Sequence, residues 1–202
     1  MKKISTLFKK DPSNLGRVIN EIDPQNQWVF DGMANATRKW DGTACKIIDG
    51  EIYKRYDAKH GKLPPVGAIP CQEPDPITGH WPHWVKCDRN NPADKYFFEG
   101  LENTKVKHGN FLHPIYNNET FELVGPKINK NEPFTSHRLL RHKGEFDISS
   151  RFELSFDGIK KFFEDRPYIE GLVFHHKNDD RMCKIRLSDF GIKRDISRYK
   201  FI

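Results

Sequence analysis

The sequence predicts an α+β fold built on antiparallel sheet, because strand-like segments outnumber helical ones and several neighbouring strands are joined by tight turns. The chain has 202 residues, which is the length of one domain. Its fifteen Phe, six Tyr and four Trp can build a core, although only 36% of the residues are hydrophobic. We therefore expect a single domain over residues 1–202.

The N-terminal segment, residues 1–25, is predicted to be helical. Ser13 is placed as the N-cap, and Asp23-Pro24 would end the helix. The apolar residues in between recur at helical spacing: Leu15, Val18, Ile19 and Ile22.

The rest of the regular structure is predicted to be strands and one further helix. Strand character occurs in six segments: residues 28–30, 44–48, 52–56, 120–124, 171–175 and 183–187. Asp49-Gly50 is a hairpin signal, and residues 177–180 read as a second turn. A helix should begin after Ser155 and end before Pro167. Its apolar face would be Ile159, Phe162 and Phe163.

Residues 62–94 form a Pro/Trp-rich loop, in which seven prolines exclude regular helix or a central strand. Trp81 and Trp84 indicate an ordered loop that packs against something. We expect the loop to cover the nucleotide site or contact RNA; its tryptophans could stack on bases, although core packing is more usual for them. Four of its residues could be read as a metal set: Cys71, His80, His83 and Cys87. Their spacing is not a usual zinc pattern, so we favour a packed loop with ordinary histidines.

The formal charge of +6 permits a polyanionic partner. Residues 177–202 hold eight Lys/Arg against four Asp/Glu, and residues 187–202 form a short basic C-terminal tail. We expect no signal peptide, no membrane partner and a monomer. The four cysteines show no CxxC pairing, which favours reduced thiols in a cytoplasmic or nuclear protein.

Four short segments carry residues suited to phosphoryl chemistry: Lys39-Trp40-Asp41-Gly42, Phe121-Glu122-Leu123-Val124-Gly125, Glu170-Gly171-Leu172-Val173-Phe174 and Lys184-Ile185-Arg186. A lysine amine is a nucleophile only when neutral, and a neighbouring cation such as Arg38 favours that state. Lys184 and Arg186 lie two apart in a strand and so share a face, where both can bind one polyphosphate. A strand glutamate is costly to bury unless it binds a hydroxyl or a metal.

In this order the segments resemble motifs I, III, IV and V of the covalent nucleotidyltransferases, the superfamily of DNA ligases, RNA ligases and mRNA capping enzymes. Residues 69–84, together with Glu122-Leu123-Val124-Gly125-Pro126-Lys127, are similar to the vertebrate-type ATP-dependent 5′-to-3′ RNA ligases. The similarity covers about residues 25–190. It implies a ligase-type adenylation domain. Only sixteen residues follow Arg186, so we expect no OB-fold.

The resemblance also implies a role for each residue. Lys39 would attack ATP and become AMP-lysine, and Glu170 would bind Mg²⁺ (or Mn²⁺) directly or through water. The residues implied in nucleotide binding are Thr37, Arg38, Arg55, Glu122, Lys184 and Arg186, with Lys54, Asp41, Gly42 and Phe152 as secondary candidates. Glu122 would hold a ribose hydroxyl. The activated AMP would pass to an RNA 5′-phosphate, and an RNA 3′-OH would then displace it.

Three further questions stay open at this point. Phe146 or Phe152 could stack on adenine, although core packing is the better expectation for either. A basic cluster is either solvated surface or an RNA contact: His137, Arg138, Arg141, His142 and Lys143. The alternatives to an RNA ligase are a GTP-dependent guanylyltransferase of the capping type and a catalytically inactive RNA-binding module of the same fold.

Overall fold

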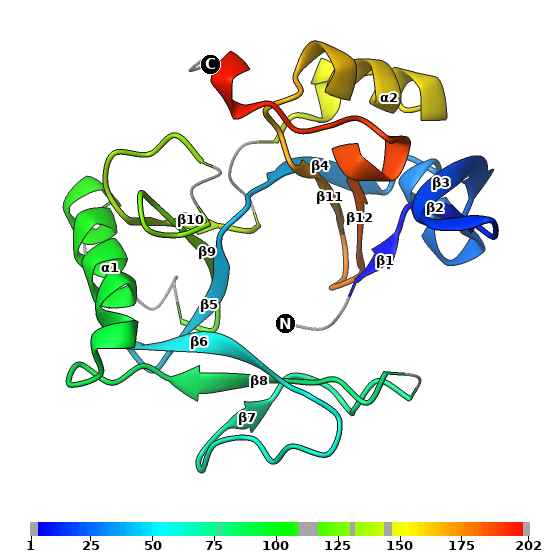
Figure 1. Cartoon of the computed structure of the whole chain (residues 1–202). Helices are drawn as coiled ribbons and strands as arrows, with labels where there is room; N and C mark the ends of the chain where they lie inside the picture. The colour runs from blue at the N-terminus through cyan, green and yellow to red at the C-terminus, as the bar shows by residue number, and fades with distance from the viewer. Residues whose placement is uncertain (1–3, 77, 109–116, 130–131, 144–146, 200–202) are drawn as a thin grey trace. The chain divides into compact units, whose positions relative to one another are not determined.

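The computed structural model describes residues 4–76, 78–108, 117–129, 132–143 and 147–199 (Figure 1). They form an α+β structure whose sheets are mostly antiparallel, as predicted. The chain divides into two compact units. Within the described ranges, unit 1 takes residues 41–142 and unit 2 takes residues 4–40 and 143–199.

Unit 2 is built on a four-stranded sheet in the order β1 (Ser5–Thr6), β12 (Met182–Arg186), β11 (Gly171–His176) and β4 (Ala34–Lys39). β1 runs parallel to β12, whereas the other neighbours are antiparallel. One face of the sheet is apolar and packs against helix α2 (Phe156–Asp165). The core there includes Ile159, Phe162, Phe163, Leu172, Phe174 and Ile185.

Unit 1 contains a six-stranded antiparallel sheet. Its order is β10 (Arg138–Arg141), β9 (Thr120–Val124), β5 (Thr43–Ile48), β6 (Glu51–Ala58), β8 (Trp81–Lys86) and β7 (Ile69–Pro70). Helix α1 (Lys95–His108) packs on it through Phe97 and Leu101, which share a core with Phe121 and Leu123.

Several predicted elements are confirmed. β5 and β6 form the predicted hairpin, and both turn residues, Asp49 and Gly50, have positive φ. Helix α2 begins after Ser155, whose hydroxyl accepts the Gly158 N–H. β11 and β12 pair across the predicted turn at residues 177–180.

The helix predicted within residues 1–25 is wrong. β2 (Phe8–Asp11) and β3 (Asn14–Ile22) form an antiparallel hairpin there. The Asp11 carboxylate accepts hydrogen bonds from the Ser13 N–H and hydroxyl, a local turn that reverses the chain where we expected a helix cap. The apolar spacing was misleading because Leu15 is exposed.

Two other local predictions are wrong. Residues 28–30 are not a strand, because 3₁₀ helix η1 (Pro24–Val29) starts at Asp23-Pro24, where the Asp23 side chain accepts the Gln25 N–H. The Pro/Trp-rich loop contains an internal strand, β8, despite Pro82. The missing N–H of Pro82 is tolerated next to a two-residue partner strand, and its carbonyl accepts the Cys71 N–H.

The C-terminal tail also holds short regular structure, namely the 3₁₀ helices η5 (Leu187–Phe190) and η6 (Ile196–Arg198). The described residues contain no helix that is both long enough and apolar enough to cross a membrane.

Candidate active site

Four of the predicted residues share one face of the unit 2 sheet. Lys39 on β4 lies opposite Gly171 on β11, and Gly171 lies opposite Arg186 on β12. Two residues along, Thr37 and Lys184 flank the same β11 strand at Val173. Directly paired residues and residues two apart point to one side of a sheet. Since the alternating residues of these strands build the apolar core, the polar face is the one that Lys39 occupies.

A direct contact on this face joins Lys39 to Glu170. Lys39 Nζ donates to Glu170 Oε2 at 2.7 Å, and the two side chains are 25% and 22% exposed. Glu170 precedes Gly171, where a Cβ would lie 2.4 Å from the backbone oxygen of Ile185. Only glycine therefore lets β11 approach β12 at this point, directly after the residue that carries the carboxylate.

Lys184 adds a second amine to the same face. Burial, followed by the positive charges of Lys39 and Arg186, lowers the pKa of Lys184 to about 8. The sequence singled out Arg38 as the cation near Lys39. Arg38 instead alternates to the opposite face, where it stacks on Trp40 at 4.0 Å. Lys184 is thus the basic side chain that repels Lys39 across the sheet.

The Lys184 pKa predicts a pH-dependent stability. Below about pH 8 Lys184 is charged in both states. Its ammonium is partly buried in the folded protein and fully solvated in the unfolded chain, so the charge destabilises the folded state. Because the unfolded chain keeps its proton up to about pH 10.5, the free energy of unfolding should rise between about pH 8 and 10.5. Urea unfolding at several pH values checks this. The rise should be smaller in Lys184→Met, which should also be the more stable form at pH 7, and identical curves for the two proteins would contradict it.

Arg186 is held by a network that sequence patterns did not indicate. The carboxylate of Asp189, 1% exposed, accepts from the Arg186 backbone N–H at 2.8 Å, from Arg186 Nη2 at 3.2 Å and from Lys10 Nζ at 2.7 Å. Burial by itself would raise the pKa of Asp189, but these hydrogen bonds hold it below its usual range. The Arg186 side chain, 41% exposed, is therefore oriented by a buried anion. The only sequence hint was an acidic residue three positions after Arg186.

In unit 1, both carboxylate oxygens of the predicted residue Glu122 take part in hydrogen bonds. Its Oε1 accepts the Gly42 N–H at 3.0 Å, and its Oε2 lies 2.9 Å from His142 Nε2. His142 Nδ1 lies 3.0 Å from the Thr120 hydroxyl. Because a carboxylate only accepts, His142 Nε2–H donates to Glu122, and in the neutral ring Nδ1 accepts from Thr120. The glycine is required here, since a Cβ at Gly42 would lie 2.1 Å from the Leu123 backbone oxygen.

The two basic candidates on β6 are paired with acids inside unit 1. Arg55 Nη2 bonds Asp57 at 3.0 Å. Lys54 bonds the buried carboxylate of Asp94, which also accepts the Asp88 N–H. Lys54 thus neutralises a buried acid, which gives it a structural role. Asp41 accepts from the Asn129 side-chain amide at 3.0 Å.

Two further candidates lie within the packed parts of unit 2. Phe152 packs against Phe162 and Phe174 on the apolar side of the sheet, which is the core packing we preferred for it. Thr37 is buried, and its hydroxyl lies 3.0 Å from His175 Nε2. Phe146 lies outside the described residues.

Several residues behind the weaker sequence signals form ion pairs or are buried. Most of the basic cluster near β10 is paired: His137 bonds Glu99, Arg141 bonds Glu119, and His142 bonds Glu122. Among the residues that the structure describes, no group of three or more potential ligands is arranged to hold a metal. Burial raises the pKa of Cys87 to about 12, which disfavours the thiolate that a zinc site would need.

No family model matches this chain, and no curated protein matches it closely enough to count as a relative. A function for the chain has to be inferred from its own residues and their geometry.

Proposed function

We propose that the chain is an ATP-dependent RNA ligase with the nucleotidyltransferase fold, which forms an AMP-lysine at Lys39. The observation that carries this proposal is the meeting of Lys39, Glu170, Lys184 and Arg186 on one polar sheet face, although Lys39 and Glu170 are 131 residues apart in the chain. A reactive amine, a carboxylate and two phosphate-binding cations are the groups that nucleotidyl transfer to a lysine requires.

In the first step, the neutral Lys39 amine attacks the α-phosphorus of ATP. A P–N bond forms, the bond from that phosphorus to the bridging oxygen breaks, pyrophosphate leaves, and the nitrogen loses one proton. The amine must first give up its hydrogen bond to Glu170, which the present geometry holds at 2.7 Å. Lys184 and Arg186 neutralise charge on the phosphates, and the alignment of attacking and leaving atoms supplies most of the catalysis.

Glu170 is suited to a Mg²⁺ ion that arrives with the nucleotide. Such an ion is held by one or two carboxylates plus phosphates and water, so the absence of a larger ligand cluster among the described residues is no obstacle. A divalent ion bound there would stabilise negative charge on the phosphates. The Glu170 carboxylate would hold such an ion, and Lys39 can attack once its own hydrogen bond to Glu170 is broken.

In the second step, an RNA 5′-phosphate oxygen attacks the phosphorus of AMP-lysine, the P–N bond breaks, and Lys39 recovers its amine. In the third step, an RNA 3′-OH attacks the 5′-phosphate, AMP leaves, and a 3′–5′ phosphodiester remains. Each step exchanges one bond at phosphorus, so ATP is the only source of chemical energy needed.

Intact-mass spectrometry of the purified chain tests the proposal most directly. Incubation with ATP and Mg²⁺ should add the mass of one AMP group, and a peptide map should place it on Lys39. Addition of a nicked RNA carrying 5′-phosphate and 3′-OH ends should remove the adduct and seal the nick. A protein that gains no mass with ATP, or gains mass only with GTP, would contradict the assignment.

His142 offers a prediction about nucleotide recognition. If Glu122 binds a ribose hydroxyl, His142 acts as a positioning residue, because its Nε2 hydrogen bond at 2.9 Å fixes one carboxylate oxygen. His142→Ala should raise the KM for ATP about tenfold, which corresponds to the loss of one hydrogen bond to a charged group, while kcat for adduct formation changes little. His142→Gln, whose amide can donate to Glu122, should restore part of the affinity. An unchanged KM in His142→Ala would contradict this role.

A further inference from the structure

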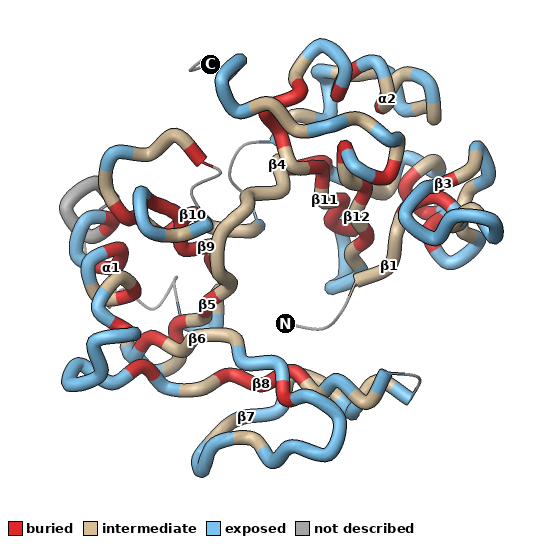
Figure 2. The backbone as a smooth tube through the Cα atoms, in the orientation of Figure 1, coloured by how far each residue is buried: buried red, intermediate tan, exposed pale blue. Residues whose placement is uncertain are grey.

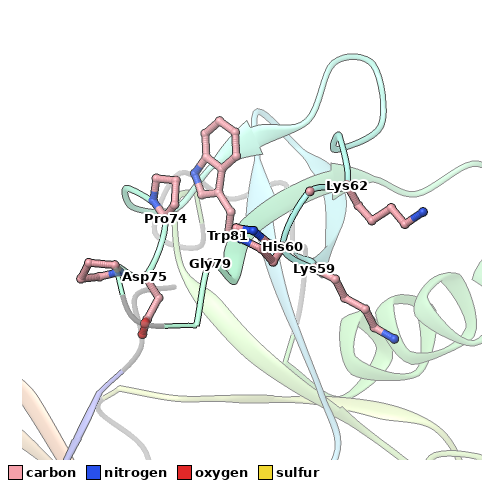
Figure 3. A pocket seen from close by; sticks show the side chains of 9 residues that line it. Lys59, His60, Lys62, Pro74, Asp75, Gly79 and Trp81 are labelled. Carbon is pink, nitrogen blue, oxygen red and sulfur yellow. The ribbon is translucent and has the colours of Figure 1, made fainter.

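Unit 1 contains a hollow at the Pro/Trp-rich loop, lined by none of the residues proposed above to take part in nucleotidyl transfer. It has a volume of about 380 Å³ and lies between the turn that follows β6 and the segment that leads into β8 (Figure 3). This volume is within the range of about 300–1,000 Å³ that small-ligand sites occupy. The side chains that line it come from residues 59–62, 74–76, 79 and 81.

The hollow has a fixed aromatic wall. The indole N–H of Trp81 donates to the Gln72 carbonyl at 2.7 Å, and the ring meets His83 edge-on at 4.5 Å, so its orientation is set. Figure 3 shows the Trp81 ring standing beside Pro74 with His60 close by. A side chain at position 79 would collide with His60 at 2.2 Å, and Gly79 takes a positive φ that suits glycine.

The rim carries more positive than negative charge. Lys59 and Lys62 are exposed, and neither ammonium forms an ion pair within the part of the chain that the structure describes. Figure 3 shows both lysine side chains extending outward from the turn. The one carboxylate among the lining residues, Asp75, accepts the Thr78 N–H and so holds its own loop together.

The chain segment beside the turn exposes several large apolar side chains to solvent. Figure 2 shows the segment that joins β6 to β7 as mostly exposed. Within the described residues, seven large hydrophobic side chains are exposed, and four of them fall in residues 56–69: Tyr56, Leu63, Val66 and Ile69. Exposed apolar groups gathered in one segment mark an interaction surface.

We propose that this hollow binds an unpaired nucleotide of single-stranded RNA, with the base against Trp81 and the flanking phosphates near Lys59 and Lys62. Aromatic stacking combined with unpaired cations is the usual means of holding a single strand without reading its sequence. The inference rests on the proposed function, since RNA is the substrate assigned there.

The test uses the full chain with Lys59→Glu and Lys62→Glu, singly and as a double variant, and Lys86→Glu as the charge-reversal control for the single variants. Lys86 is an exposed lysine at the other end of β8. Fluorescence anisotropy of a labelled single-stranded RNA should show binding weakened about tenfold in the double variant, with the salt slope reduced by about 1.4, and little change in the control. The AMP adduct should form normally in all of these variants, because Lys39 lies in unit 2.

A Trp81→Leu variant should also bind RNA about tenfold more weakly, whereas Trp81→Phe, which keeps an aromatic face, should retain most of the affinity. The lysine variants keep the proposal testable if Trp81→Leu fails to fold. RNA affinity unchanged in the double variant would overturn the inference. So would an effect on binding of free ATP instead of RNA, or a self-association of the chain that the double variant abolishes. Failure of the wild-type protein to form an AMP adduct would instead refute the proposed ligase activity, whatever the RNA binding.

Discussion

Substitution of Lys39 by arginine is expected to abolish the covalent AMP adduct while unit 2 stays folded. The guanidinium keeps the positive charge and can still pair with Glu170, which contacts Lys39 at 2.7 Å. It cannot lose its proton near neutral pH and so offers no nucleophilic lone pair. Adduct formation should fall by at least about a thousandfold, as expected when a covalent nucleophile is removed.

The measurement is retention of label from α-labelled ATP on the denatured protein. Lys161→Arg, the same substitution at an exposed position on α2, is the control and should label normally. Lys39→Ala should lose the adduct as completely as Lys39→Arg. Lys39→Arg keeps a cation beside Glu170, whereas Lys39→Ala removes it. If both variants lose the adduct, the loss comes from the missing nucleophile and not from the missing ion pair. Label that persists on Lys39→Arg would show that another residue is modified.

Substitution of Gly171 by alanine is expected to destabilise unit 2 by about 3 kcal/mol, which is the upper range for inserting a methyl group into a closely packed site. The new Cβ would lie 2.4 Å from the Ile185 backbone oxygen and 3.0 Å from Arg186 Cα. Neither atom belongs to a flexible side chain, so β11 and β12 would have to separate. That movement would displace Lys184 and Arg186 on β12 from Lys39 on β4, and adduct formation should fall as well.

Urea unfolding measures the loss, and hydrogen exchange of the β11 amides locates it in unit 2. Gly16→Ala is a suitable control, since its Cβ would meet only the side-chain oxygen of Asn14 at 3.1 Å on an exposed strand. The control should change the free energy of unfolding by less than about 0.5 kcal/mol. Equal stability of the two variants would mean that the sheet accommodates a side chain at Gly171.

The sequence predicted the parts of the fold that local chemistry determines. Asp49-Gly50 allows the positive φ values of the hairpin turn, and Ser155 supplies a helix cap. The Lys-x-Arg spacing correctly placed Lys184 and Arg186 on one face of a strand. These features depend on neighbours within a few residues, so they can be read from the chain alone.

Features set by distant packing were missed. Helix α1 has a glycine in its interior, Gly100, where a Cβ would lie 2.6 Å from Leu123 Cδ1 on β9. The helix gives up intrinsic stability for close contact with the sheet, which its own sequence does not reveal. Asp189, which orients Arg186, is itself bonded by Lys10, 179 residues away in the chain. No local pattern can indicate a contact of that separation.

The order of the two units along the chain has a consequence for synthesis. Residues 41–142 are continuous in unit 1, whereas unit 2 is assembled from segments on both sides of them. As the chain leaves the ribosome, β5, β6, β8 and β9 can pair before β11 and β12 have been translated. β4 then waits without its strand partner β11, and Lys39 lacks its Glu170 contact until that residue emerges. The face proposed to react with ATP is therefore completed last, so a truncated chain would fold in part without acquiring nucleotidyl-transfer chemistry.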